Sequence, residues 1–129
     1  MNRDITEIRG SNRKVELVTP TGDRTGIFFE LREPDCPQIL QVERAYENAL
    51  IRARGKLKSA EREKLKTDRI VAGVEGWDFE DEAMTINGEH PSFAESALRR
   101  LIRDIPWVRR FLDQEMADEM AFFEASNTV

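Results

Sequence analysis

The side chains that most often carry out catalysis or hold metals are scarce in this sequence. His90 is the only histidine and Cys36 the only cysteine, so neither a zinc site of imidazole and thiolate nor a nucleophile-histidine triad is easily assembled. His90 stands beside Pro91 and is predicted to be a loop residue that faces solvent. Cys36 is near an expected helix start, where a thiol can become reactive, but we interpret it as a small structural residue. The sequence therefore predicts no catalytic residue, no metal site and no cofactor.

Two segments contain residue types that also occur in ligand-binding loops. The carboxylates of one segment have a spacing similar to that of a calcium loop, and they are Asp78, Glu80, Asp81 and Glu82. Ala83 follows where the EF-hand pattern requires a glycine, so we interpret this segment as a solvated acidic loop. Gly22 and Gly26 are not followed by the Gly-Lys-Ser/Thr ending of a phosphate loop, and we predict that they are turn residues.

Length and composition indicate one domain. The chain has 129 residues, of which 40% are hydrophobic, and this is enough for one modest core. Its net charge of −5 works against a general affinity for nucleic acid or anionic membranes. Residues 1–12 lack the apolar core of a signal peptide, and no run approaches the roughly 18 apolar residues that span a bilayer. Because a single cysteine also suits a reducing compartment, we expect a cytoplasmic protein without membrane association.

The N-terminal part predicts a β-hairpin and then a helix. Apolar residues alternate with polar ones over 15–19 and 27–31, and Pro20, Gly22 and Gly26 favour a reversal between them. Pro37 is tolerated in a first helical turn, and Gly55 is a natural helix stop. We expect the apolar stripe between these two residues to face the core, and it consists of Ile39, Val42, Tyr46, Ala49, Leu50 and Ala53.

A second helix is predicted to begin at Ser59 and to be closed by Gly76. Its first half is nearly all charged, so only its apolar end, residues 70–74, is expected to be deeply buried. Residues 77–91 are predicted to form an ordered loop in which Asn87-Gly88 makes a turn.

Two further helices complete the predicted fold. Ser92 and Glu95 match a capping box ahead of apolar residues at helical spacing, and Pro106 ends that helix and begins the next. The stripe of this last helix contains Val108, Leu112, Met116, Met120 and Phe123. The sequence thus predicts an α+β, mainly α fold with an N-terminal hairpin and about four helices. We expect a single domain over 13–124, a flexible tail over 1–12 and a short C-terminal tail over 125–129.

Charge is unevenly distributed along the chain. Residues 52–74 have a local balance of +5, whereas residues 75–129 have a balance of −8. The basic residues of the first segment are Arg52, Arg54, Lys56, Lys58, Arg62, Lys64, Lys66 and Arg69. We favour a solvated basic face that compensates the acidic half, within the molecule or across a homo-oligomer contact, over contact with an acidic partner. Nucleic-acid binding is the least favoured of these uses, because no aromatic residue in the segment can stack on bases.

Large, soft apolar side chains are more numerous than a core of this size obviously needs. They are Tyr46, Trp77, Phe79, Trp107, Phe111, Met116, Met120, Phe122 and Phe123. Methionine and aromatic residues are typical of adaptable binding surfaces, although each of these residues can also be a core residue. Phe122 and Phe123 are neighbours about 100° apart on a helix, so we expect at least one of them to be available to a partner.

Several segments occur in an order that resembles a known family. They are the hairpin 15–22, the basic helical middle, residues 71–78, 91–98 and 105–108, and the final Phe122-Phe123. Together they resemble the tail assembly chaperones of long-tailed, siphovirus-type bacteriophages and prophages. The resemblance covers residues 13–124, and its most specific pieces are Gly76-Trp77-Asp78 at a helix end and the proline and tryptophan spacing that follows. None of these pieces is a catalytic signature.

The resemblance implies a small, α-rich, often oligomeric protein without enzymatic activity. Such a protein keeps the long, helical tape measure protein soluble in the host cell cytoplasm, helps to recruit subunits of the tail tube protein, and is absent from the mature virion. Apolar helical surfaces that cover a helical client would suit this task. The residues that the resemblance points to for client or self contacts are Trp77, Trp107, Phe111, Met116, Met120, Phe122 and Phe123. Trp77 and Trp107 are at least as consistent with a role as core anchors.

Two other functions are consistent with the sequence. A small nucleic-acid-binding regulator would use residues 52–69 and would give a salt-sensitive mobility shift. A structural tail component would stay in the virion and would be found in purified particles. An enzyme is the least favoured class, because no group of titratable residues has a recognisable geometry.

Overall fold

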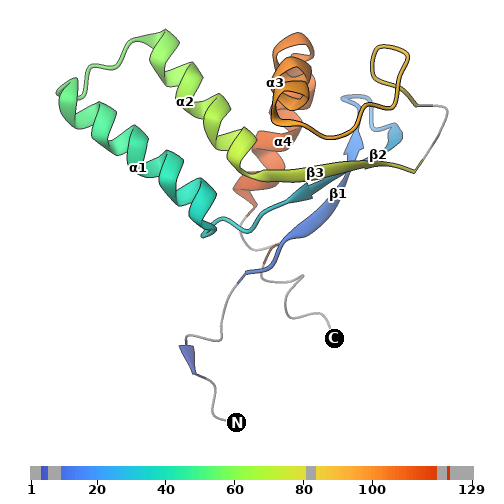
Figure 1. The fold of residues 1–129 in the computed structure, drawn as a ribbon, viewed down its shortest axis with the longest axis horizontal. Coiled ribbons are helices and arrows are strands. Elements are labelled where there is room, and N and C mark those ends of the chain that lie inside the picture. The colour runs from blue at the N-terminus through green and yellow to red at the C-terminus, as the bar shows by residue number, and fades with distance from the viewer. Residues whose placement is uncertain (1–3, 6–9, 81–83, 119–121, 123–129) are drawn as a thin grey trace.

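The computed structural model describes residues 4–5, 10–80, 84–118 and 122. Its elements are, in chain order, β1 (Arg13–Val18), β2 (Arg24–Leu31), α1 (Pro37–Arg52), α2 (Ser59–Ala72), β3 (Val74–Phe79), α3 (Glu95–Asp104) and α4 (Pro106–Ala117). The fold is α+β, with the predicted hairpin, the four predicted helices and one additional strand (Figure 1).

The three strands form one antiparallel sheet in the order β1-β2-β3. Along the central strand β2 every second side chain is buried, beginning at Thr25 and continuing through Ile27 and Phe29 to Leu31. This alternation places one side of the strand against the core, as its period of two requires. Helices α3 and α4 lie over that side of the sheet (Figure 1). Phe29 stands opposite Val15 of β1 and Trp77 of β3, so the middle of the core crosses all three strands.

Strand β3 corrects the prediction for residues 74–79, which we expected to be a helix end followed by a loop. Helix α2 ends at Ala72, and Gly73 caps it. The chain then pairs with β2, with Gly76 opposite Glu30 and a register shift between Glu30 and Leu31. The segment Gly76-Trp77-Asp78 therefore lies in a strand, not at a helix end. A glycine and a register irregularity disturb the alternation that would mark a strand in the sequence.

The start of α3 is a second correction. Ser92 was expected to cap the helix, but α3 begins at Glu95, and its cap residue Ala94 is extended with no side-chain cap hydrogen bond. The predicted Asn87-Gly88 turn is confirmed, because both residues have positive φ angles, of 52° and 81°, and Ile86 bridges to Glu89. Pro106 begins α4, as predicted.

The core is shared by the sheet, the end of α2, α3 and α4. Its most completely buried large side chains are Phe29, Phe122, Leu31, Ile39, Ile70, Leu98, Leu112, Val74 and Val108. Helix α1 supplies only Ile39 to this set, although it is the longest helix. Within the described ranges, none of the helices is long and apolar enough to cross a membrane.

Candidate protein-interaction surface

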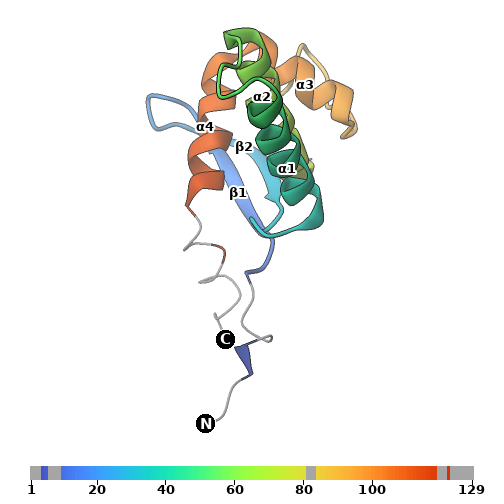
Figure 2. The same cartoon turned by 90° about the vertical axis from the view of Figure 1, so that its left-hand side faces the viewer.

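Helices α1 and α2 form a pair that extends away from the sheet, and we call residues 37–72 the arm (Figures 1 and 2). Helix α1 ends where Arg54 and Gly55 take φ angles of 52° and 78°. The N–H of Gly55 donates to the carbonyl of Leu50 at 2.8 Å, which satisfies one of the last free carbonyls of the helix. Leu57 is buried next to this reversal, and α2 begins two residues later. The predicted helix stop at Gly55 is confirmed.

The apolar stripe of α1 is less buried than predicted. Ile39 is 1% exposed, but the rest of the stripe, from Val42 to Ala53, is only half-buried. The reason is that α1 packs chiefly against α2 and not against the sheet. The expectation that the whole stripe faces the core is therefore wrong, because beyond its first turn α1 is covered mainly by one neighbouring helix.

A second set of apolar side chains on α1 faces solvent. Leu40 is 40% exposed and Ile51 is 75% exposed, and they are among the three exposed large hydrophobic residues of the described chain. Eleven positions separate them, so at about 100° per residue they project from the same side of the helix. The exposed Glu47 lies between them on that side. We call Leu40, Glu47 and Ile51 the outer face of α1.

An apolar groove borders the outer face. It has a volume of about 290 Å³ and is open to solvent. Val42 and Tyr46 of α1 and Leu65 of α2 provide its apolar lining, and charged residues of both helices border it. One of these, Arg69, makes an ion pair with Glu43 across the two helices, with 3.4 Å between Nε and Oε1. A groove of this kind suits an apolar side chain of a partner helix, with the charges at its edges to fix the orientation.

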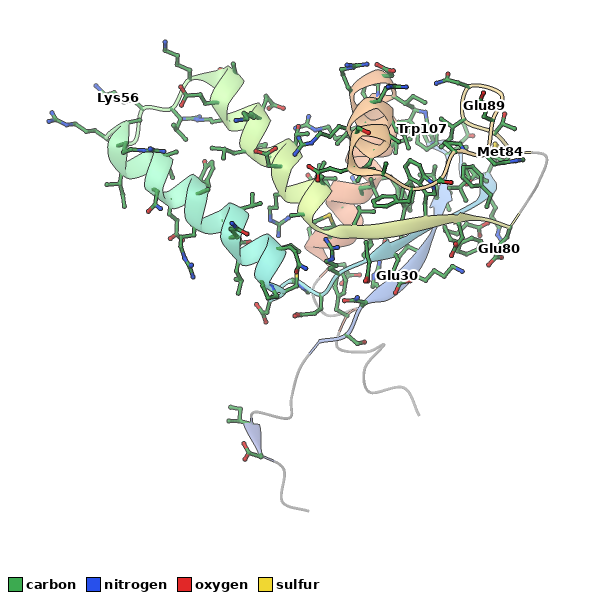
Figure 3. The ribbon with its side chains drawn as sticks, in the orientation of Figure 1. Glu30, Lys56, Glu80, Met84, Glu89 and Trp107 are labelled. Atoms are coloured by element: carbon green, nitrogen blue, oxygen red, sulfur yellow. The ribbon has the colours of Figure 1, made fainter. Side chains whose placement is uncertain are left out.

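The predicted basic residues extend from the outer end of the arm along α2, where Arg69 lies in the last turn before the sheet. All of them except Arg69 are exposed, and Lys56 marks the end farthest from the sheet (Figure 3). Lys66 pairs with Glu63 at 3.9 Å, a weak surface contact that leaves most of the positive charge uncompensated. No aromatic ring belongs to this set. The outer end of the arm can therefore attract an acidic surface, but it has no ring of its own on which bases could stack.

Three of the residues expected to contact a partner are instead in the core. Trp77 is 8% exposed and packs edge-on against Phe29 and Phe93, with ring centroids 6.3 Å and 5.1 Å away. Its indole Nε1 donates to the Pro91 carbonyl at 2.9 Å. Met116 is 2% exposed. For Trp77 the core-anchor alternative is the one that the structure supports, because burial and a satisfied indole N–H leave nothing for a partner to reach.

Phe122 is a core residue. At least one of the neighbours Phe122 and Phe123 was expected to be available to a partner, and Phe122 was named as a contact residue, but its side chain is 0% exposed. The guanidinium of Arg13 lies over its ring, 5.2 Å from the centroid, and the N–H of Ser11 donates to its carbonyl at 3.2 Å. The start of β1 and the residue Ser11 before it therefore contact this phenylalanine, a long-range contact that helical spacing alone cannot indicate. Met120 and Phe123 lie outside the described residues.

Trp107 and Phe111 are the two predicted contact residues that stay partly accessible. Both are half-buried in α4 and line an open groove next to Pro20 and the end of β1. Trp107 also packs against the core, so its two predicted roles are compatible.

Among the described residues outside these surfaces, no group of side chains has an evident catalytic or metal-binding chemistry. His90 is exposed, as predicted, and its Nε2 lies 2.8 Å from the Met84 carbonyl. Cys36 is buried and is the residue before α1. Among the residues that the structure describes, no three His, Cys, Asp or Glu side chains are grouped so that they could hold a metal ion.

Sequence reasoning missed the outer face of α1 and a cluster of arginines on α3 and α4. Leu40 and Ile51 are isolated apolar residues in a polar context, and only their spacing of eleven residues indicates a common side. The arginines were hidden because charge was counted over the whole acidic segment 75–129 and not along one helix. Neither a family model, nor a curated protein, nor a solved structure matches this chain.

Proposed function

We propose that this protein is a non-catalytic tail assembly chaperone of a long-tailed bacteriophage or prophage. It binds the tape measure protein in the host cell cytoplasm, helps to recruit tail tube subunits, and leaves before the virion is complete. The family resemblance of residues 13–124 is one support. The observation that carries the proposal is the arm, because α1 presents Leu40 and Ile51 to solvent beside an open apolar groove.

The outer face of α1 is suited to a helical client. Fully burying a leucine or isoleucine side chain contributes roughly 1.5–3 kcal/mol, and Ile51 has more surface left to bury than Leu40. A client helix that places one apolar side chain in the groove and others on Leu40 and Ile51 would meet the arm along its length. The basic outer end of the arm would attract acidic client segments and set the direction in which the helix lies.

The small size of this surface is consistent with release. Interfaces well below about 1,200 Å² are typical of weak and transient contacts. A long client with a repeated apolar pattern can hold many copies of such a chaperone, because neighbouring weak contacts add up along one chain. Each copy then exchanges readily for a tail tube subunit.

An affinity pull-down tests the proposal. The tagged full chain is expressed with the tail genes of the phage, and retained proteins are identified by mass spectrometry over a salt series. We expect the tape measure protein, with or without the tail tube protein. The Leu40→Glu, Ile51→Glu double variant should lose this client. The Gln41→Glu, Ala45→Glu double variant should keep it, because it adds the same charge at exposed positions on another side of α1.

Three results contradict the proposal. Recovery of the client by the Leu40→Glu, Ile51→Glu variant shows that the outer face is not the binding surface. Presence of the protein in purified virions identifies a structural tail component instead. Recovery of nucleic acid alone, lost as salt rises, favours a regulator, and the exposed basic residues at the end of the arm are the observation that keeps this second function in view.

A further inference from the structure

Residues 75–129 are acidic overall, but their basic residues are concentrated in one place. All five of them occur between residues 99 and 110. Three belong to α3, where Ser96, Arg99, Arg100 and Arg103 follow the spacing i, i+3, i+4, i+7. Residues at this spacing share one side of a helix, so α3 has a polar stripe that contains three guanidinium groups.

This stripe borders an open groove between α3, α2 and the start of α4. The groove has a volume of about 590 Å³, and α4 adds a fourth arginine, Arg109, to its wall. Thr67 of α2 contributes a hydroxyl group, and Ile102 and Pro106 contribute apolar surface. We call this feature the arginine groove. It is built from the consecutive helices α3 and α4 and from α2, which is distant in sequence, and therefore only the folded chain has it.

Two arginines of the groove have hydrogen-bond donors without acceptors. Arg100 is exposed and makes no ion pair with any residue in the described part of the chain. The Nε of Arg109 is buried and has no partner among the described atoms, while its Nη2 donates to Glu63 at 2.7 Å. A buried donor without an acceptor is uncommon in a folded protein, so the Arg109 guanidinium is incompletely paired within the described part of the chain.

The other two guanidinium groups are already paired within the chain. Arg99 lies 2.9 Å from Asp68 and 3.2 Å from Glu95, and Arg103 lies 3.0 Å from Asp104. Burial works to lower the pKa of Arg99, but the hydrogen bonds that Arg99 donates to Asp68 and Glu95 outweigh it and leave the pKa raised. These ion pairs show that guanidinium groups at the groove already bind acidic side chains.

The same carboxylates argue against a nucleic-acid ligand. A phosphate backbone carries a negative charge at every nucleotide and would set a continuous row of charges against Glu63 in the groove, whereas a peptide can alternate carboxylates with neutral residues. No aromatic residue lines the groove, so bases would have no ring on which to stack. A peptide carboxylate does not depend on stacking, and it can replace an internal carboxylate as the partner of a guanidinium fork.

We propose that the arginine groove is a binding site for an acidic peptide segment of a partner protein, whose carboxylates pair with Arg100 and Arg103 and whose oxygen atoms reach Arg109. The site is formed by α2, α3 and α4 and is separate from the outer face of α1. It does not rest on the proposed chaperone function, and it would give the chain a second point of contact in an assembly.

Fluorescence anisotropy with a defined probe tests this site. The probe is a short labelled peptide of alternating glutamate and serine, and the control probe has glutamine in place of glutamate. We expect the full chain to bind only the acidic probe. The Arg100→Gln, Arg103→Gln variant should weaken binding by about tenfold or more, because charge-assisted forks are lost. The charge-matched Arg54→Gln, Lys56→Gln variant at the end of the arm should change binding by less than about twofold.

A titration of the isotope-labelled full chain followed by NMR locates the probe independently of any variant. Amide shifts concentrated over residues 96–109 support the proposal, and shifts confined to the arm overturn it. Equal weakening by the two double variants also overturns it, since binding would then follow net charge alone. A single-stranded oligonucleotide that competes with the same dependence on Arg100 and Arg103 would assign the groove to phosphate instead of carboxylate.

Discussion

The terminal methyl carbon of Met116, in α4, occupies the space into which a side chain on Gly73 would project. Gly73 ends α2 and leads directly into β3, so this contact fixes the junction of helix and strand against the last helix. The φ angle of Gly73 is −86°, which any residue can adopt. A larger residue at this position is therefore opposed by the end of a neighbouring side chain and not by the backbone.

Gly73→Ala is expected to lower the free energy of unfolding by about 1–3 kcal/mol, because the new Cβ displaces Met116 within a packed core. Shortening the neighbour should relieve the clash, so Gly73→Ala combined with Met116→Val should cost less than the sum of the two single changes. Urea denaturation of the four proteins of this cycle measures the coupling. Additive effects would show that Met116 moves aside freely.

Phe122→Ala is expected to destabilise the protein by about 3–5 kcal/mol, as for other buried phenylalanines. The fraction that remains folded should still bind its client, because the ring is covered by Arg13 and is not on the surface. Phe28→Ala is the control, since Phe28 is only half-buried and should cost less. Thermal denaturation combined with the pull-down measures both effects. If Phe122→Ala loses the client while its stability is unchanged, Phe122 contacts the client directly.

Trp77→Phe should reduce the free energy of unfolding by about 1–2 kcal/mol, because it removes the hydrogen bond from the indole N–H to the Pro91 carbonyl. The matched change Trp107→Phe affects a half-buried tryptophan and should cost less. Chemical denaturation compares the two variants. Hydrogen exchange over residues 84–94 should also rise in Trp77→Phe alone, because this bond ties that segment to β3.

Asp68→Asn should strengthen binding of the acidic probe by about twofold to fivefold, because it leaves Arg99 with Glu95 as its remaining carboxylate partner. Glu61→Gln removes the same charge from an exposed position on the same helix and should change the affinity less. The anisotropy assay described above measures both. Equal gains in the two variants would indicate a general charge effect without a specific role for Arg99.

Local sequence determined most element boundaries. Pro37 and Gly55 bracket α1 within a few residues, and Pro106 separates α3 from α4. These positions were predictable because proline restricts the backbone and lacks an N–H, and because glycine readily takes the positive φ angle that ends a helix. The alternation of 15–19 and 27–31 likewise predicted the hairpin, since its two strands are close in sequence and need no distant partner.

Tertiary contacts decided the elements that the sequence left open or indicated wrongly. Residues 74–79 form a strand because they pair with one edge of β2. The alternation of apolar and polar residues within 74–79 does not indicate this pairing. Ser92 does not cap α3, although its capping-box sequence predicted that it would. Phe93 instead packs against Trp77 at 5.1 Å, and α3 starts two residues later than a Ser92 cap implies.

For the candidate surfaces, too, one part could be predicted from the sequence and the other part was decided by the fold. The composition of the chain indicated an adaptable, partner-binding protein, and periodicity placed Tyr46 and Leu50 on one stripe of α1. Only the folded arrangement shows that this stripe is half-buried, that Leu40 and Ile51 remain exposed, and that Phe122 is covered. Burial depends on which neighbour an element packs against, and α1 packs chiefly against α2 whereas Phe122 contacts Arg13 at the start of β1. Sequence patterns state which side of an element is apolar, but the packing partner decides whether that side becomes core or surface.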